Sequence, residues 1–404
     1  MRAIIAGGGI GGLTAALAFH HVGWEVVVLE QERAPLAEGA GIQLSPNGCK
    51  ILRALRLEEA AKRVAHAPNA LAVRDGMSGE HILRLPLGKG AAERRWGAPY
   101  VQLQRSDLLD ILRTALEARA PGALHKGVRV LGYANANDNT NTSAGGHVTA
   151  LATGRTQWQG DLLVAADGVH SALRTQMLGE ARPRFTGYAA WRAVVPTEAL
   201  GEYAPLPNTC LWLGRDQHAV TYRLRRGELV NFVGVVPQAI WSSDSWRAQG
   251  RRADARAQFA GWHQSLRKVL DEAHPLYFWG LLERSPLPRW HDGLAVLMGD
   301  AAHAMLPFMA QGAVMAMEDG WRLAQLCADA NGRLETALRQ FYRQRRARTH
   351  AAQRASQRNG AIFHRRNLAG RALHGAPRWL MRALGPRLLA ARLNRFYGYD
   401  ATAG

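Results

Sequence analysis

The chain has 404 residues, 47% of them hydrophobic and 21% charged, a composition typical of a globular protein large enough for two closely joined domains. No apolar run reaches the roughly 18 residues that span a bilayer, and the N-terminal MRAIIAGGGIGG breaks into glycines too early for a signal peptide. Cys49, Cys210 and Cys327 are scattered without metal-ligand spacing, which argues against a disulfide framework or a metal site and fits the cytoplasm.

The net charge of +19 comes mostly from the C-terminal part of the chain. Between Thr336 and Tyr399 there are 15 arginines and no Asp or Glu. These arginines lack interleaved aromatic residues or a base-reading motif, so we expect no nucleic-acid partner. The simplest interpretation is a solvated basic face on C-terminal helices, whose field could also attract an anionic dinucleotide or carboxylate. The amphipathic stretch from Pro377 to Leu393 leaves membrane contact possible, but we expect its apolar face to dock on the protein itself.

The hydrophobic pattern predicts a mixed α/β fold. Buried strands are expected at 3–6, 25–30, 161–166 and 294–298, and helices at 13–21, 45–65, 104–119 and 252–272 and through most of the chain after 312. A β-α-β unit in the first 30 residues implies a parallel sheet. Short strands at 189–195, 209–213, 218–224 and 229–236 predict an antiparallel sheet forming one wall of a pocket. Residues 135–146 read as a polar surface loop.

The first strand runs into a glycine-rich turn that indicates dinucleotide binding. Gly7, Gly9 and Gly12 satisfy G-x-G-x-x-G between a strand and a helix, and Glu30 ends the second strand, where it can accept hydrogen bonds from a ribose. A bare G-x-G-x-x-G can be only a tight turn, but the strand, helix and acidic residue together favour a pyrophosphate at the helix N-terminus. The pattern does not distinguish FAD from NAD.

A second glycine-containing segment occurs almost 290 residues later. Residues 298–319, MGDAAHAMLPFMAQGAVMAMED, place Gly-Asp after an apolar run, then a proline-containing loop, then glycines that open a helix. We therefore expect one cofactor to be held by segments near both ends of the chain. The domain that binds it would be interrupted by the predicted antiparallel sheet.

Three ordered motifs resemble the group A flavoprotein monooxygenases, which are single-component FAD-dependent aromatic hydroxylases. They are the N-terminal glycines, the segment VAADGVHSALR at 164–174 and the segment GDAAHAMLPFMAQGA at 299–313. The resemblance covers nearly the whole chain and is strongest to the branch of salicylate, 3-hydroxybenzoate 6- and 6-hydroxynicotinate 3-hydroxylases, which also resembles this chain in its ending FYGYD. It implies the p-hydroxybenzoate hydroxylase fold. A Rossmann-like FAD-binding domain would comprise 1–178 and 289–375, a substrate-binding β-sheet domain 179–288 and a helical tail 376–404.

The resemblance also implies which residues hold FAD. Asp300 would contact the ribityl chain, the backbone from Gln311 to Val314 the pyrimidine end of the flavin, and Arg105 the phosphates. Asp167 would serve both FAD and the pyridine nucleotide. The full expected set is Gly7, Gly9, Ile10, Gly11, Gly12, Glu30, Gly41, Arg105, Asp167, Asp300, Gln311, Gly312, Ala313 and Val314.

The substrate side follows from one strand and one loop. His218 and Tyr222 lie at even separation on a predicted strand and so face the same side, about 13 Å apart. The resemblance gives His218 the role of deprotonating the ring hydroxyl and places Pro307 beside flavin and substrate. A lone strand histidine is more often structural, but an imidazole can act as base for a phenol.

At two places, the 307–308 loop and position 47, this chain departs from its near relatives. Phe308 stands where the hydroxynicotinate enzymes carry His, Pro307 where the 3-hydroxybenzoate enzymes carry Gln, and Asn47 replaces an earlier pocket histidine. We expect Phe308 and Asn47, with His218 and Tyr222, to contact the substrate, and His303 to be structural rather than catalytic.

The resulting hypothesis is an NADH- or NADPH-dependent hydroxylase that uses O2 through a flavin C4a-hydroperoxide on an aromatic ring, acting as a monomer or homodimer. Two alternatives stay open at this point. One is a quinone-pathway or membrane-associated flavin hydroxylase or epoxidase, and the other is a flavin-binding regulatory or electron-transfer protein without oxygenase activity.

Overall fold

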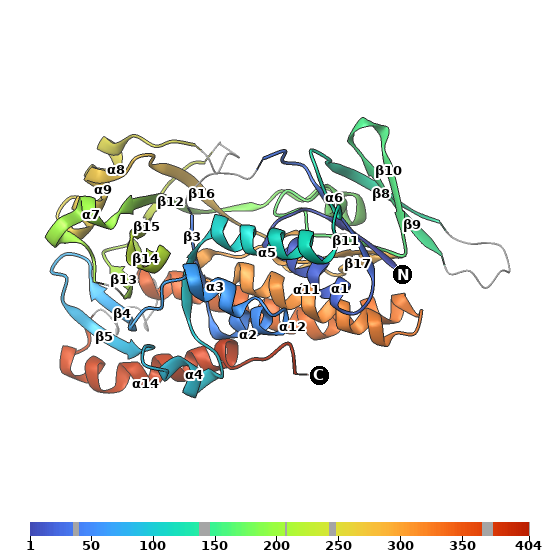
Figure 1. Ribbon diagram of the computed structural model, residues 1–404. Helices are drawn as coiled ribbons and strands as arrows, with labels where there is room; N and C mark the ends of the chain where they lie inside the picture. The colour runs from blue at the N-terminus through green and yellow to red at the C-terminus, as the bar shows by residue number, and fades with distance from the viewer. Residues whose placement is uncertain (35–39, 137–145, 207, 242–247, 366–374, 404) are drawn as a thin grey trace.

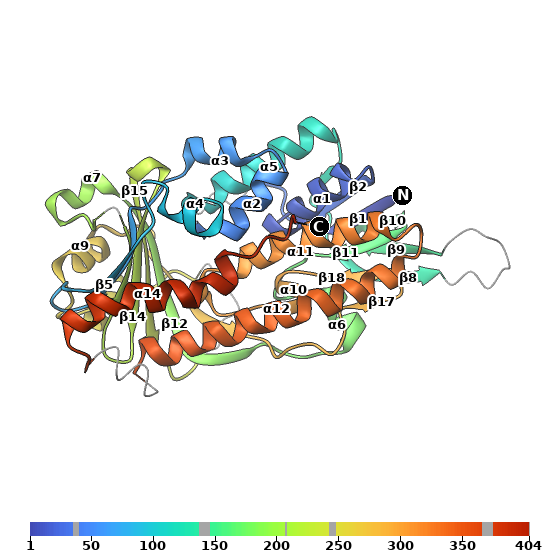
Figure 2. The ribbon, with the colours of Figure 1, turned by 90° about the horizontal axis from the view of Figure 1, so that it is seen from below.

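The structure, a computed structural model, describes residues 1–34, 40–136, 146–206, 208–241, 248–365 and 375–403. It is elongated, with one β-sheet region near each end and long C-terminal helices running between them (Figures 1 and 2). The predicted polar loop at 135–146 falls largely outside the described residues, between two strands that flank it.

A six-stranded sheet carries the N-terminal end of the chain. Across the sheet its strands are β17 (His291–Asp292), β18 (Ala295–Leu297), β11 (Leu162–Ala165), β1 (Arg2–Ala6), β2 (Glu25–Glu30) and β7 (Leu124–Lys126). All neighbours pair in parallel except β17, which is antiparallel to β18. The predicted parallel sheet is thus confirmed, because buried runs such as Leu162–Ala165 pack on both faces.

Helices cover this sheet. The helix α1 (Ile10–His21) is buried from Ile10 to Phe19 with few interruptions, since it packs against the sheet, α5 (Arg105–Arg119) and α11 (Gly312–Asp329). The other helices of this end are α2 (Pro46–Ala54), α3 (Glu58–Val64), α4 (Ala91–Trp96), α6 (Ala172–Leu178) and α10 (Asp300–His303). A three-stranded sheet of β8 (Val130–Ala136), β9 (His147–Ala152) and β10 (Gln157–Gly160) and a two-stranded sheet of β3 (Gly41–Leu44) and β6 (Val101–Gln104) complete it.

A seven-stranded sheet forms the other end. Its order is β16 (Tyr277–Glu283), β12 (Arg184–Pro196), β15 (Leu229–Pro237), β14 (His218–Leu224), β13 (Thr209–Leu213), β4 (Ala70–Asp75) and β5 (His81–Pro86). Two features differ from the expectation of an antiparallel sheet confined to 179–288. The strands β4 and β5 come from the N-terminal part of the chain, and β4 pairs with β13 in parallel. Local patterning cannot show such a pairing, because it joins segments more than 130 residues apart.

The predicted helix at 252–272 is two helices, α8 (Arg252–Gln258) and α9 (Gln264–Glu272). Between them Phe259 and Trp262 are buried in the core of this end, and Gly261 adopts φ +77°. A residue in the left-handed conformation ends a helix. The helical spacing of apolar residues therefore continues through 259–263, although the backbone there is not helical. The remaining short helix here is α7 (Thr197–Leu200).

Two long helices follow. The helix α12 (Leu334–Phe363) has 30 residues, so it spans about 45 Å and reaches from one sheet region to the other (Figure 2). The helix α14 (Arg378–Tyr397) packs Leu393, Phe396 and Tyr397 against Leu85 and Trp96, which is the expected docking on the protein itself. Its exposed Leu384 and Leu388 are four residues apart and share one side of the helix, whereas the exposed Trp379, nine residues before Leu388, lies on the opposite side. Within the described ranges, none of the helices combines the length and apolar character that a bilayer crossing demands.

Candidate active site

Three of the sequence motifs follow three neighbouring strands at aligned ends. In the register of the six-stranded sheet, Ala6 is opposite Ala165, and Ala165 is opposite Leu297. Because these strands are parallel, the segments that begin at Gly7, Ala166 and Met298 leave the same edge of the sheet. The carboxyl edge of a parallel sheet is where α/β proteins bind their ligands.

The glycine turn is shaped by close backbone approaches. Gly7 adopts φ +111°, and a Cβ there would overlap the carbonyl oxygen of Ala166. A Cβ at Gly12 would overlap the carbonyl oxygen of Gly7, so only glycine lets α1 start this close to the strand. Gly11 lies where a Cβ would come within 2.9 Å of Ala316 on α11. The N-terminal turn and the later glycine segment are therefore in direct contact, as one shared ligand requires.

Glu30 fastens the turn to the second strand. Its carboxylate accepts a hydrogen bond from Gly8 N at 2.6 Å and another from Glu32 N at 2.8 Å. A carboxylate has about four lone-pair positions, so two backbone bonds still leave acceptor capacity for ribose hydroxyls.

Two observations show that the edge fits a dinucleotide such as FAD. Gly9 has an ordinary φ of −75°, and a Cβ built on it meets none of the described atoms within 4 Å, so glycine here leaves space in front of the α1 N-terminus rather than relieving strain. Asp167 Oδ1 is buried without a hydrogen-bond partner among the described residues, and burial raises the pKa of this carboxyl. An unpartnered buried acceptor next to an open phosphate cradle suits a ligand that brings donors.

The open space at Gly9 leads to a first prediction. Gly9→Val should weaken FAD binding by at least tenfold while the apoprotein keeps its melting temperature, because valine can adopt φ −75° and its Cβ has no described atom within 4 Å. FAD affinity is measured by flavin fluorescence and stability by thermal unfolding. Gly12→Val is the matched comparison, and there we expect loss of the fold as well. Unchanged FAD affinity in Gly9→Val would place the pyrophosphate elsewhere.

The start of α11 provides the second half of the cradle. Gln311 is its N-cap residue, and no side chain caps the helix among the described residues, which leaves first-turn amides of Gly312, Ala313 and Val314 able to face negative charge. Asp300 is exposed, and its Oδ1 lies 3.9 Å from the Cβ position of Gly312. Arg105 opens α5 with an exposed side chain, and its backbone N donates to Ala40 O at 2.6 Å. The roles expected for these residues stay predictions.

Asn47 lies in a buried network on the cofactor side. Its Nδ2 donates to Gln311 Oε1 at 3.1 Å and to Glu318 Oε1 at 2.8 Å, and its Oδ1 accepts from Ser45 Oγ. Gln311 Nε2 in turn donates to Ser45 Oγ at 2.8 Å. All four side chains are buried, so Asn47 and Ser45 hold the Gln311 side chain at the start of α11. The contacts of Asn47 thus favour support of the cofactor edge over the substrate contact predicted for it.

Beneath α11 lies a buried ion network that the sequence did not reveal. Arg345 Nε donates to Asp319 Oδ1 at 2.7 Å and its Nη1 to Glu318 Oε2 at 2.8 Å, and Arg348 also pairs with Glu318. His303 Nε2 lies 2.5 Å from Asp319 Oδ2, which also accepts from Gly299 N at 3.0 Å. The network therefore anchors the Gly299-Asp300 turn. Arg345 is fully buried and so departs from the interpretation of the basic tail as a solvated face, whereas most arginines in the described part of this segment, Arg343 and Arg346 among them, are exposed as expected.

Asp319 carries the second prediction. Burial alone would raise the pKa of Asp319, but the adjacent His303 ring and the Arg345 guanidinium outweigh burial and hold this pKa well below its usual value of 3.8. Its stabilisation is therefore present above that unfolded value and is lost as the pH falls below it. Asp319→Asn should lower the free energy of unfolding by about 3–5 kcal/mol at neutral pH, because it removes one of the two buried carboxylates, Asp319 and Glu318, that pair with buried Arg345. Urea unfolding tests this, with the exposed Asp329→Asn as control. A loss equal to that of the control would contradict the anchoring role.

The substrate residues of β14 lie on one side of the seven-stranded sheet. His218 and Tyr222 are both buried, with 1% and 6% of their surfaces exposed. Burial raises the pKa of Tyr222. The Tyr222 ring lies within 2.6 Å of a Cβ built on Gly41, and Asn231 Oδ1 accepts from Gly41 N at 2.9 Å. Glycine at position 41 is therefore explained by the approach of Tyr222, which brings the seven-stranded sheet against the two-stranded sheet. The direct contact of Gly41 with FAD stays a prediction.

His218 sits in an aromatic cluster. Its ring meets Phe308 and Phe363 edge-on, each at 5.1 Å between centroids, and lies 5.0 Å from the ring of His364. Tyr188 stacks on His364 at 4.4 Å. Burial first, and His364 second, lower the pKa of His218 well below its usual 6.5, so the imidazole is neutral at pH 7.

The loop that carries Pro307 and Phe308 is tied to α12 by three side chains at helical spacing. Gln353 Nε2 donates to Ala304 O at 3.1 Å, Ser356 Oγ to Leu306 O at 2.5 Å, and Asn359 Nδ2 to Phe308 O at 2.8 Å. Pro307 itself is exposed and begins a short 3-10 turn, Pro307–Met309. Gly360 completes the face, because a Cβ there would come within 3.0 Å of the Phe308 ring. Sequence reasoning missed these residues, although small and amide side chains every third position stand out in an arginine-rich helix.

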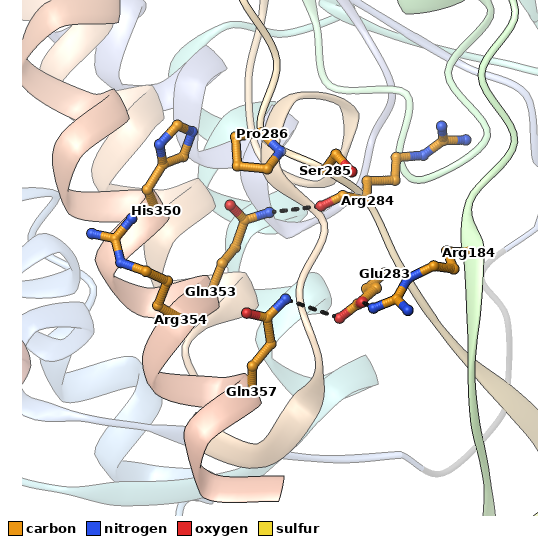
Figure 3. Close-up of a pocket in the computed structure, with 9 residues that line it drawn as sticks. All are labelled: Arg184, Glu283, Arg284, Ser285, Pro286, His350, Gln353, Arg354 and Gln357. Carbon is orange, nitrogen blue, oxygen red and sulfur yellow. Dashed lines mark hydrogen bonds and ion pairs between the residues drawn. The ribbon is translucent and has the colours of Figure 1, made fainter. Parts of the chain in front are cut away.

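A pocket of about 290 Å³ lies beside α12, and Gln353, which also contacts the loop, is one of its lining residues (Figure 3). It is lined by Arg184, Glu283, Arg284, Ser285, Pro286, His350, Gln353, Arg354 and Gln357. Glu283 pairs with Arg184 and accepts from Gln357, while Gln353 donates to Arg284 O at 3.3 Å as well as to the loop. Within the described ranges, no group of His, Cys, Asp and Glu side chains is arranged to hold a metal ion.

Comparisons with known proteins agree with a flavin-binding site at the carboxyl edge of the six-stranded sheet. The family described as FAD binding domain matches residues 1–358. The 3-amino-4-hydroxybenzoate 2-monooxygenase of Streptomyces platensis is 35% identical, covering 90% of this chain and 88% of that protein. The 6-hydroxynicotinate 3-monooxygenase of Bordetella bronchiseptica is 34% identical, covering 89% and 91%. Klebsiella pneumoniae HpxO complexed with FAD and uric acid matches with a TM-score of 0.84 at 27% identity, covering 98% of this chain and 96% of that chain.

Proposed function

The chain belongs to the FAD-binding domain family of flavin-dependent aromatic monooxygenases, and we propose that its substrate is a small aromatic acid with a ring hydroxyl, of the hydroxybenzoate or hydroxypyridine type. The observation that carries this proposal is the neutral, buried His218, whose ring contacts Phe308, Phe363 and His364 beside the loop that continues from the cofactor edge. Aromatic side chains around one polar group suit a planar ring with one hydroxyl.

Bound FAD supplies the reductive activation of O2, with NADH or NADPH as the electron source, and the protein supplies the geometry. The cradle at Gly9, the carboxylates of Glu30 and Asp167, and the α11 N-terminus would hold FAD, and the first turn of α11 would favour negative charge at its end of the flavin. The α12 side chains hold Phe308 against His218.

His218 would act on the substrate hydroxyl. A neutral imidazole nitrogen accepts the hydroxyl proton, and the electron pair of the O–H bond stays on oxygen, which makes the ring more electron-rich toward an electrophilic oxygen. Burial disfavours the imidazolium, so the proton moves only when the phenolate that forms lies against it. His218 is 1% exposed, so its burial excludes water from this contact.

The direct test is a substrate screen on the yellow holoenzyme. Salicylate, 3-hydroxybenzoate, 3-amino-4-hydroxybenzoate and 6-hydroxynicotinate are each added with NADH or NADPH, and reductant, O2, peroxide and product are measured together. At least one ring should stimulate reductant oxidation and leave as a hydroxylated product with less than equimolar peroxide. Oxidation that every ring leaves unstimulated, or that yields only peroxide, would contradict the proposed substrate class and favour the non-oxygenase alternative.

A further inference from the structure

Two buried histidines from distant parts of the chain face each other through their ring nitrogens. His218 is the first residue of β14, and His364 is the C-cap residue of α12. His218 Nδ1 lies 2.8 Å from His364 Nε2, and each ring is 1% exposed. When both rings are neutral, such a contact contains one N–H, which one ring donates and the other accepts.

The position of His364 is fixed from two directions. Its ring stacks on Tyr188 with an interplanar angle of 26°, and Phe308 meets it edge-on at 6.1 Å. Its backbone N donates to Gly360 O at 3.0 Å, so the residue continues the helix whose side chains grip the 304–308 loop. His364 therefore moves only if α12 and that loop move with it.

We propose that His364 is a positioning residue for the substrate base, accepting the Nδ1–H of His218 so that the lone pair of His218 stays on Nε2. The inference rests on the base role proposed above for His218. The substrate O–H proton then passes to His218 Nε2, and the hydroxyl oxygen keeps the bonding pair. The His218 imidazolium retains its Nδ1–H bond to His364, which shares the positive charge.

A neutral partner has a consequence that a carboxylate partner would not have. A carboxylate fixes the tautomer of a histidine and also raises its pKa, because it stabilises the imidazolium. His364 fixes the tautomer without adding negative charge. The pair can therefore orient the base without placing a carboxylate beside the phenolate that forms.

The tautomer can be measured without any substrate. In protein labelled with 15N-histidine, long-range 1H–15N correlation spectra at pH 7 distinguish an Nδ1–H from an Nε2–H ring, and the signal lost in His218→Asn assigns His218. We expect the Nδ1–H form in the parent protein, loss of that preference in His364→Phe, and its retention in His364→Gln, whose amide oxygen can accept the same hydrogen bond. His350→Gln, on the same helix but in the other pocket, is the control.

Kinetics on a ring found by the screen gives the second readout. His364→Phe should lower kcat by about 10–100-fold, the usual cost of removing an orienting partner, while FAD content and KM stay near parent values and His364→Gln recovers most of the rate. An Nε2–H His218 in the parent, or a tautomer unchanged in His364→Phe, would overturn the inference. Normal hydroxylation by His218→Asn would instead overturn the base role, whatever the tautomer, so the two failures are distinguishable.

Discussion

His218→Asn is expected to lower ring hydroxylation by about 10²–10⁴-fold while the protein keeps its full complement of FAD. The substitution removes the nitrogen that accepts the substrate proton, so the ring reacts as a phenol rather than a phenolate. Product is quantified by chromatography and FAD by its absorbance, at saturating reductant. The effect should appear in product formation far more than in flavin reduction, because His218 lies in the seven-stranded sheet and the cradle at Gly9 on the other sheet.

His125→Asn is the matched control for this prediction. His125 also lies on a strand, β7, and also packs on an aromatic ring, that of Trp158 at 4.5 Å, but it belongs to the edge of the six-stranded sheet. It should hydroxylate like the parent. Equal rates in His218→Asn and His125→Asn would mean that the ring is not deprotonated by His218.

Phe308→Ala is expected to lower kcat/KM for the preferred ring by about 10–200-fold and to raise the share of reductant lost as peroxide. The Phe308 ring touches His218 edge-on, and Gly360 leaves the space into which it packs. Removing the Phe308 side chain exposes the His218 ring to water and lets the substrate ring bind in more than one pose. The measurement compares kcat/KM and peroxide across the four rings of the screen.

Phe308→Leu keeps most of the side-chain volume and should retain most of the parent kcat/KM. This control separates the loss of packing against His218 from a general loss of stability. Preference among the rings should change in Phe308→Ala, because Phe308 contacts His218 edge-on and, by the resemblance, stands where the hydroxynicotinate enzymes carry His. A variant with parent kcat/KM and parent coupling would show that substrate preference is determined elsewhere.

Local patterns were sufficient for much of the fold. The bounds of β2, β13 and β14 agree with the sequence expectation, since alternating or continuous apolar runs end at turn residues there. The pairing of β4 with β13 was not accessible in this way, because it depends on a partner more than 130 residues away. The burial of Arg345 was missed for a related reason. A count of charges does not show that Arg345 pairs with Glu318 and Asp319 on α11.

The site shows the same division. The glycine turn, Glu30 and the Gly-Asp segment could be placed from sequence, because each follows a strand and the strands align at one edge. His364 could not be placed from sequence, since no local pattern in α12 indicates that the end of this helix contacts β14. Asn47 was assigned to the substrate by its match to a pocket histidine, whereas its contacts run to Gln311 and Glu318.

The central claim, that His218 takes the ring proton inside the aromatic cluster, is tested most directly by the ionisation state of the bound ring. Difference absorption spectra of the preferred ligand on the holoenzyme, recorded anaerobically without reductant at pH 7, separate phenolate from phenol, which free in water titrates near ~10. The parent protein should show the phenolate, and His218→Asn should bind the same ligand as the phenol. A ligand that stays protonated on the parent, or ionises equally on both proteins, would contradict the account.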